Sequence, residues 1–242
     1  MSKIAQNMNK VTIYGDYVSQ PFRAVVSFCK MNQIPHTIHE MRLSKKEQMT
    51  DKYKKINPVQ KVPAIVDGDF NLFESHAILK YLKKSRECPD HWYPNQDIKL
   101  RAKVNEYMDW HHVGLRGTSM KYSILRFREL CNDQAQIDSA HNDFRKSLKL
   151  IENYWLSSQN KQFLVGDQMT LADLTSACEM AHYLPTQEDF YKDFPKIKAW
   201  LGRIMDIPEV KEVHQQIFEV QRRGYARLDS EREEKIKDVG KL

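Results

Sequence analysis

The stretch Tyr14–Ala24, YGDYVSQPFRA, decides how the first part of this chain folds. The apolar run Val11–Tyr14 leads into it and predicts a strand. A helix pattern begins at Pro21, because proline in a first turn loses no needed hydrogen bond and its φ suits a helix. Ser19 and Gln20 therefore lie at a helix start, where free N–H groups and the helix dipole attract an anion. The Ser19 hydroxyl can donate to such an anion, or it can simply cap the helix.

Strand and helix patterns alternate through the N-terminal third. After the predicted helix Pro21–Asn32, the alternating stretch His36–Met41 predicts a strand and completes a right-handed βαβ unit. Lys61–Phe73 contains two short apolar strands around an Asp-Gly turn, which predicts a hairpin. Another helix pattern opens at Glu74. The order βαβ then ββα predicts a thioredoxin-like domain, in which Ser19 replaces the redox cysteine pair.

Several residues of this domain can hold an extended peptide. Pro63 cannot donate to a strand ladder. If its peptide bond is cis, the Val62 N–H and C=O turn outward to pair with a peptide; the alternative is an ordinary trans proline at a sheet edge. Ser75 can bind a carboxylate and Glu74 an ammonium group, or the pair is a plain helix cap with an exposed acid. Together with Ser19, these residues fit a small thiol peptide.

The rest of the chain shows helix patterns only. A linker at 89–96 carries two prolines, and Asp97–Glu129 then predicts one long helix. Ala135–Leu156 predicts another helix, and Thr170–Asp173 is a capping-box start for a third. One face of the helix at Ala135–Leu156 gathers four apolar residues, namely Phe144, Leu148, Ile151 and Trp155.

The predicted fold class is therefore α+β with two domains, a thioredoxin-like βαβ-ββα domain and an all-α C-terminal domain. We expect an N-terminal extension at 1–9, the first domain at 10–88, the linker at 89–96 and the helical domain at 97–224. The charged stretch 225–242 is expected to be a loose tail.

Composition argues against several function classes. The 242 residues carry a net charge of +6, but acids are interspersed with the basic residues, so we expect no nucleic-acid partner. No apolar run is long enough to span a membrane, and a polar start without a leader pattern predicts a cytoplasmic protein. The four cysteines are far apart, which argues against a zinc site, a dithiol centre or a disulfide scaffold. His111 and His112 are adjacent and point to different helix faces, so we expect no metal site there.

Three motifs in order resemble the glutathione S-transferase family, and its serine-type theta class in particular. They are SQPFRA at 19–24, NPVQKVPA at 57–64 and DGDFNLFES at 67–75. PDHWYP at 89–94 and GDQMTLAD at 166–173 extend the resemblance into the helical domain, so that it covers about Val11 to Val220.

The resemblance implies a glutathione site in the first domain, with glutathione as co-substrate and no tightly bound cofactor. It implies that Ser19 donates a hydrogen bond to the glutathione sulfur. The residues implied to bind glutathione are Gln20, Gln48, Lys61, Val62, Pro63, Glu74 and Ser75. Two positions depart from the theta pattern: Gln48 stands where a histidine is usual, and Val113 where some relatives carry an acid.

On the long helix, Arg116 resembles a theta-class arginine near the sulfur, and an exposed helix arginine is the alternative. Trp110 and Tyr122 are candidates for an electrophile pocket, as is Phe127, although each can equally pack in the core. A homodimer is a further implication of the resemblance.

Two functions of different classes follow. The first is a glutathione transferase that conjugates the thiolate to small electrophiles, with peroxidase or dehalogenase activity as further possibilities. The alternative is a transferase-like scaffold without catalysis. A sulfur-facing hydroxyl together with a ligand clamp favours the enzyme.

Overall fold

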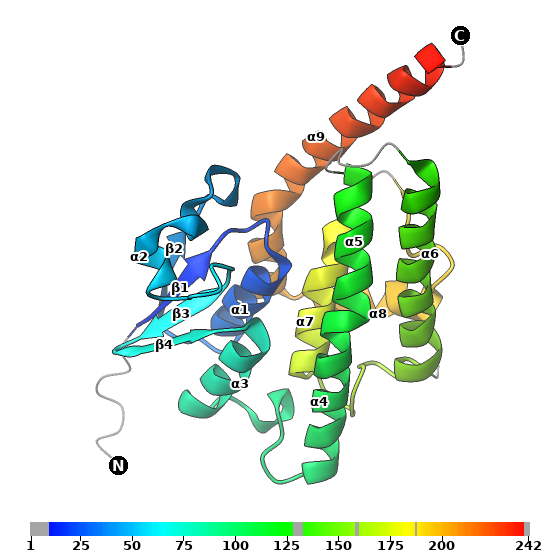
Figure 1. Ribbon diagram of the computed structural model, residues 1–242. Helices are drawn as coiled ribbons and strands as arrows, with labels where there is room; N and C mark the ends of the chain where they lie inside the picture. Colours follow the sequence, from blue (N-terminus) through cyan, green and yellow to red (C-terminus); the bar gives the residue numbers. More distant parts are fainter. Residues whose placement is uncertain (1–9, 128–132, 158–159, 187, 240–242) are drawn as a thin grey trace, which may run out of the picture.

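The computed structural model describes residues 10–127, 133–157, 160–186 and 188–239, which form a sheet layer beside a group of helices (Figure 1). The strands are β1 (Val11–Gly15), β2 (His36–Glu40), β3 (Ala64–Asp67) and β4 (Phe70–Phe73). They lie in the order β2-β1-β3-β4, with β1 parallel to β2 and the other two pairs antiparallel. This mixed sheet confirms the thioredoxin-like prediction.

Short helices cover both faces of this sheet. In this half the helices and helical turns are α1 (Gln20–Met31), η2 (Leu43–Lys45), η3 (Glu47–Met49), α2 (Asp51–Lys54), α3 (Ser75–Ser85) and η4 (Asp90–Trp92). Side chains alternate across a strand, so Ile13 of β1 faces the core shared with α1 and α3, while Tyr14 packs beside Tyr53 of α2. The start of α1 and the start of α3 thereby lie on the same side of the sheet.

The second half of the described chain is helical. Its elements are α4 (Ile98–Val113), α5 (Leu115–Phe127), α6 (Gln134–Leu150), the π turn η5 (Ile151–Trp155), α7 (Leu171–Met180), η6 (Ala181–Tyr183), α8 (Pro195–Met205) and α9 (Pro208–Val239). Every residue of α7 is buried, and α7 contacts α1, α4, α5 and α8 (Figure 1). One hydrophobic core therefore joins the two halves. None of the helices in the described ranges has the length and apolar character needed to cross a bilayer.

The single long helix predicted for Asp97–Glu129 is wrong, because it breaks at Gly114. The backbone there has φ −80° and ψ −88°, outside the helical region, and α5 starts at the next residue. The Trp110 indole lies against Gly114 where a Cβ would stand, so only glycine fits this close approach. Residues 128 and 129 lie outside the described part of the chain.

Two further helix predictions have clear outcomes. The capping box at the start of α7 is confirmed, since the Thr170 hydroxyl accepts from Ala172 N and the Asp173 carboxylate accepts from Thr170 N. The tail predicted from Tyr225 is helical, because α9 continues to Val239, and residues 240–242 lie outside the described part of the chain. Tyr225 itself is buried, with its ring 4.6 Å from that of Phe127.

Candidate active site

Ser19 occupies the N-cap position of α1, but its side chain does not cap the helix. Its backbone is extended, with φ −82° and ψ 115°, and its carbonyl accepts from Arg23 N at 3.1 Å. The residue is only 8% exposed, and within the described ranges its hydroxyl has no hydrogen-bond partner. A hydroxyl at this position, beside the free N–H groups of a helix start, remains available to donate to an anion.

The loop before β3 presents an unpaired stretch of backbone. The Val62–Pro63 peptide bond is cis, which selects the first of the two alternatives for Pro63. The ladder begins only at Ala64, so the Val62 N–H and C=O have no partner within the described ranges. Tyr53 Oη and Asn57 Nδ2 both donate to the Lys61 carbonyl at 2.7 Å, which fixes the loop. Backbone held in this way can pair with an extended peptide.

The start of α3 differs from the predicted cap. Glu74, not Ser75, is the N-cap residue, and Glu74 adopts φ 69° and ψ 109° without any side-chain cap. Ser75 is the first helical residue and is buried, whereas the Glu74 side chain is exposed. Positive φ in a residue other than glycine carries strain and is concentrated at functional sites. The expectation that Ser75 caps the helix is therefore wrong, but Ser75 does lie at the start of α3.

The predicted binding residues Lys61 and Gln48 lie in and beside the loop before β3. Lys61 is exposed, and Gln48 is half-buried in η3 with a buried Oε1 that has no hydrogen-bond partner. Gln60 Nε2 donates to the Gln48 carbonyl at 3.2 Å, which holds η3 beside the loop that carries Lys61. On the other side, Pro21, Ser75 and Arg116 line one small cavity of about 10 Å³, so the starts of α1 and α3 meet α5 there.

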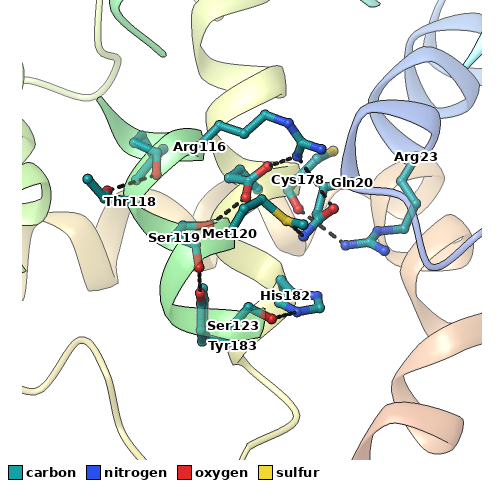
Figure 2. Close-up of polar contacts among 12 residues, drawn as sticks. Gln20, Arg23, Arg116, Thr118, Ser119, Met120, Ser123, Cys178, His182 and Tyr183 are labelled. Atoms are coloured by element: carbon teal, nitrogen blue, oxygen red, sulfur yellow. Dashed lines mark hydrogen bonds and ion pairs between the residues drawn. The ribbon is translucent and has the colours of Figure 1, made fainter. Parts of the chain in front are cut away.

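Arg116 on α5 is neither an exposed helix arginine nor an unpaired one. Figure 2 shows its guanidinium between α7 and Gln20. One guanidinium nitrogen lies 2.5 Å from Glu179 Oε2 and 3.5 Å from Gln20 Oε1. The other Glu179 oxygen accepts from the Ser119 hydroxyl at 2.6 Å. Gln20 also donates to Met120 Sδ at 3.6 Å, so α5 faces the residue next to Ser19.

Arg23 is a buried cation to which the sequence analysis gave no role. It donates to the Tyr17 carbonyl at 2.6 Å. It also donates to the Cys178 carbonyl at 3.3 Å, as Figure 2 shows. Burial lowers the pKa of Arg23, and the nearby Glu179 carboxylate opposes that shift. Arg23 thus ties the turn before Ser19 to α7. Its position among the apolar residues of α1 was the only signal in the sequence.

The predicted pocket aromatics are used in packing. The Tyr122 ring is buried with Phe144 and His141 in the helical half, and Phe127 packs near it. The Trp110 ring lies 4.3 Å from that of Trp155. Trp110 and Tyr122 stay predictions for an electrophile pocket; their rings also pack against neighbouring rings of η5 and α6, respectively.

Histidines gather where α3 meets α4. The His76 ring lies 4.2 Å from the ring of His112 and 5.4 Å from that of His111. Burial, aided by His111 and His112, lowers the pKa of His76 to about 2. Burial, aided by Arg116, lowers the pKa of His111 to about 3. In the part of the chain that the structure describes, no three His, Cys, Asp or Glu side chains are arranged to hold a metal ion.

Comparison with known proteins identifies the family. The model of the glutathione S-transferase N-terminal domain matches residues 12–84, and that of the C-terminal domain matches residues 105–208. Mouse glutathione S-transferase theta-1 is 36% identical over 197 residues, which cover 79% of this chain and 81% of that protein. The chain belongs to the glutathione S-transferase family.

Two further relatives show how much of the chain the similarity covers. Human glutathione transferase theta-2, solved in complex with glutathione and an unknown ligand, superposes with a TM-score of 0.82. That pair is 31% identical and covers 90% of this chain and 91% of the other. The Arabidopsis thaliana glutathione S-transferase T2 is 39% identical over 86% of this chain, which spans only 37% of that longer protein. The theta resemblance predicted from the sequence is confirmed.

Proposed function

We propose that this transferase-family protein joins the sulfur of glutathione to small electrophiles, with Ser19 activating the thiol. The observation that carries the proposal is the Ser19 hydroxyl, which stands at the start of α1 without capping it. The fold does not use this hydroxyl as a helix cap, and the named relatives are transferases. The scaffold alternative is therefore not favoured.

Glutathione would lie extended along the edge of the first half. The unpaired Val62 backbone beside cis Pro63 would pair with the cysteinyl unit. Ser75 and Glu74, at the strained start of α3, would hold the γ-glutamyl carboxylate and ammonium groups. This placement aims the thiol of the central residue at the start of α1, where Ser19 stands.

The other end of the ligand would meet a basic and polar edge. Lys61 is exposed and would attract the glycine carboxylate, and Gln48 beside it would donate a hydrogen bond from its amide. The uncharged Gln48 supplies less attraction than a cation would. We therefore expect the glycine end of glutathione to be held mainly by Lys61.

Activation of the thiol requires only modest energies. A free thiol has a pKa of about 8.5, and a hydrogen bond to a charged group contributes about 1.5–3 kcal/mol. That contribution lowers a pKa by roughly one to two units, which makes the thiolate abundant near neutral pH. Ser19 would donate this bond, and the Arg116 cation and the α1 dipole would add to it. The thiol proton passes to solvent. The bound thiolate then attacks the carbon of an alkyl or benzyl halide held against α5, near Met120, so that a C–S bond forms, the C–halogen bond breaks and halide is released to solvent.

Assembly and location belong to the same proposal. The family resemblance is the support for a second copy of the chain, and the exposed Val113 at the end of α4 is a position to examine in it. We propose a homodimer in the cytoplasm, and light scattering tests the dimer. No acid stands at Val113, so this position would contribute apolar contact rather than charge.

The test is glutathione-agarose binding followed by conjugation assays with benzyl and alkyl halides and organic hydroperoxides. Wild-type protein is expected to bind and to turn over at least one of these electrophiles. Ser19→Ala should bind but lose most of the turnover. Ser27→Ala is the matched control, because it removes a hydroxyl of α1 that is buried and has no hydrogen-bond partner. Binding without turnover on the whole panel would oppose the enzyme, and equal turnover by Ser19→Ala would oppose the role of Ser19.

A further inference from the structure

Glu179 is a buried carboxylate in a position where burial has to be compensated. Its side chain is 1% exposed, on a helix whose residues are all buried. A charge removed from water is tolerated only when it is paired and hydrogen-bonded. Both of its oxygens are used, Oε2 by the Arg116 guanidinium at 2.5 Å and Oε1 by the Ser119 hydroxyl at 2.6 Å.

The partner of this carboxylate faces the other half of the molecule. Arg116 is 26% exposed and points its guanidinium past Glu179 toward Gln20, the residue that follows Ser19. The contact to Gln20 is long, at 3.5 Å, so it does little to hold the guanidinium. The strong hold on Arg116 is therefore the charge-assisted bond from α7.

We infer that Glu179 is a positioning residue: it holds the Arg116 guanidinium against α7, beside the start of α1, where the cation acts on the bound sulfur. Without the carboxylate, a long and flexible arginine would turn toward solvent and leave the site. Ser119 completes the arrangement by fixing the second carboxylate oxygen. This role rests on the proposed glutathione chemistry of the Ser19 site.

The sign of a pH shift separates positioning from two other roles. If Glu179 positions Arg116, Glu179→Gln removes the cation from the sulfur, and the acid limb of the kcat/KM profile moves to higher pH. If Glu179 only offsets the charge of an arginine that stays in place, the same substitution moves that limb to lower pH. A purely structural acid leaves the limb where it is.

The experiment is a double-mutant cycle with Arg116→Gln, Glu179→Gln and the double variant. We expect each single substitution to lower kcat/KM about tenfold and to move the acid limb upward, since a charge-assisted bond is lost. The double variant should also lose about tenfold, not a hundredfold, because both changes remove the same cation. Additive losses, a downward shift, or no shift would each overturn the inference.

A control variant and a second measurement keep the test independent of folding and of the proposed function. Glu152 is another buried acid of the helical half; it accepts from Lys196 N and Ile197 N, and no ion pair to an arginine is found for it within the described ranges. Glu152→Gln should lower the melting temperature without moving the acid limb.

Thermal unfolding of the same cycle requires no activity. Arg116→Gln should lower the melting temperature by leaving a buried carboxylate unpaired, and adding Glu179→Gln should restore part of the loss. If wild-type protein is inactive but this restoration is seen, the proposed function fails while the pairing stands. If the double variant is no more stable than Arg116→Gln, the pairing itself is refuted.

Discussion

Two buried acids lie on α7, six residues apart in the chain, and they differ in the charge of the donors that bind their carboxylates. Asp173 accepts only from neutral donors: Leu164 N at 2.7 Å, Thr170 N at 2.9 Å, and the Thr170 hydroxyl and Trp200 Nε1 at 3.0 Å. Glu179 accepts from a cation and one hydroxyl. Burial raises the pKa of Asp173, and the hydrogen bonds from its donors oppose that rise.

The difference lies in where the partners come from. All donors to Asp173 belong to the helical half, and they join the loop before α7, the cap of α7 and α8. The main partner of Glu179 is a half-exposed arginine directed at the first half. An acid satisfied by neutral donors organises the fold, whereas an acid paired with a cation at the junction of the two halves organises the site.

The largest effect should come from Asp173→Ala. This change leaves the buried Leu164 N–H and Trp200 Nε1 without an acceptor and removes the carboxylate half of the capping box. We therefore expect the free energy of unfolding to fall by at least about 3 kcal/mol. Urea denaturation measures the change. Asp167→Ala, at an exposed acid of the preceding loop, should stay within about 0.5 kcal/mol of wild type. If the two variants were equally stable, Asp173 would not be the organising acid.

A second loss of stability should appear only at acid pH. It comes from His111, which lines the same small cavity as Glu179. The pKa of His111 is lowered to about 3 in the folded chain, against about 6.5 when unfolded. Between pH 3 and pH 6.5 the unfolded state binds a proton at His111 that the folded state does not bind. The free energy of unfolding therefore decreases as pH falls below about 6.5. At pH 5 the loss is about 2 kcal/mol for this histidine.

Urea denaturation at pH 7.5 and pH 5 tests this loss, with His111→Leu expected to show a smaller difference between the two. His76 and His214, whose pKa values are lowered to about 2 and about 3, shift stability in the same direction and keep part of the dependence in the variant. His39→Gln, at an exposed histidine of β2, is the control. An unchanged pH dependence in His111→Leu would show that this histidine does not titrate on unfolding.

The smallest effect should come from Thr170→Ala. This variant loses the hydroxyl that accepts from Ala172 N and donates to Asp173, while the backbone bond from Thr170 N to Asp173 remains. We expect a loss of about 1 kcal/mol, typical of a helix cap. A loss as large as that of Asp173→Ala would mean that the cap, and not the carboxylate, is the organising element.

Local features of the site could be predicted from the sequence because they depend on neighbouring residues. Ser19 before Pro21 marks a helix start, and Asp67-Gly68 between apolar strands marks the hairpin. The capping box at Thr170 and Asp173 was predicted for the same reason. The cis bond before Pro63 remained one of two alternatives, since spacing alone does not distinguish the isomers.

Features that depend on distant residues were missed. Arg116 and Glu179 are 63 positions apart, so neither shows its partner in the sequence. The break at Gly114 was missed because a single glycine inside a helix pattern is tolerated, and only the Trp110 indole makes it obligatory. Apolar spacing also cannot tell a core ring from a pocket ring, so the sequence alone does not assign Tyr122 to either.

The most direct test of the central claim is the pKa of the glutathione thiol bound to wild-type protein and to Ser19→Ala, followed by thiolate absorbance against pH. We predict that wild-type protein holds this pKa at least one unit below that of free glutathione. In Ser19→Ala, which should still bind glutathione, most of the difference should be lost. An equal pKa in both proteins would contradict the claim that the free hydroxyl at the start of α1 activates the sulfur.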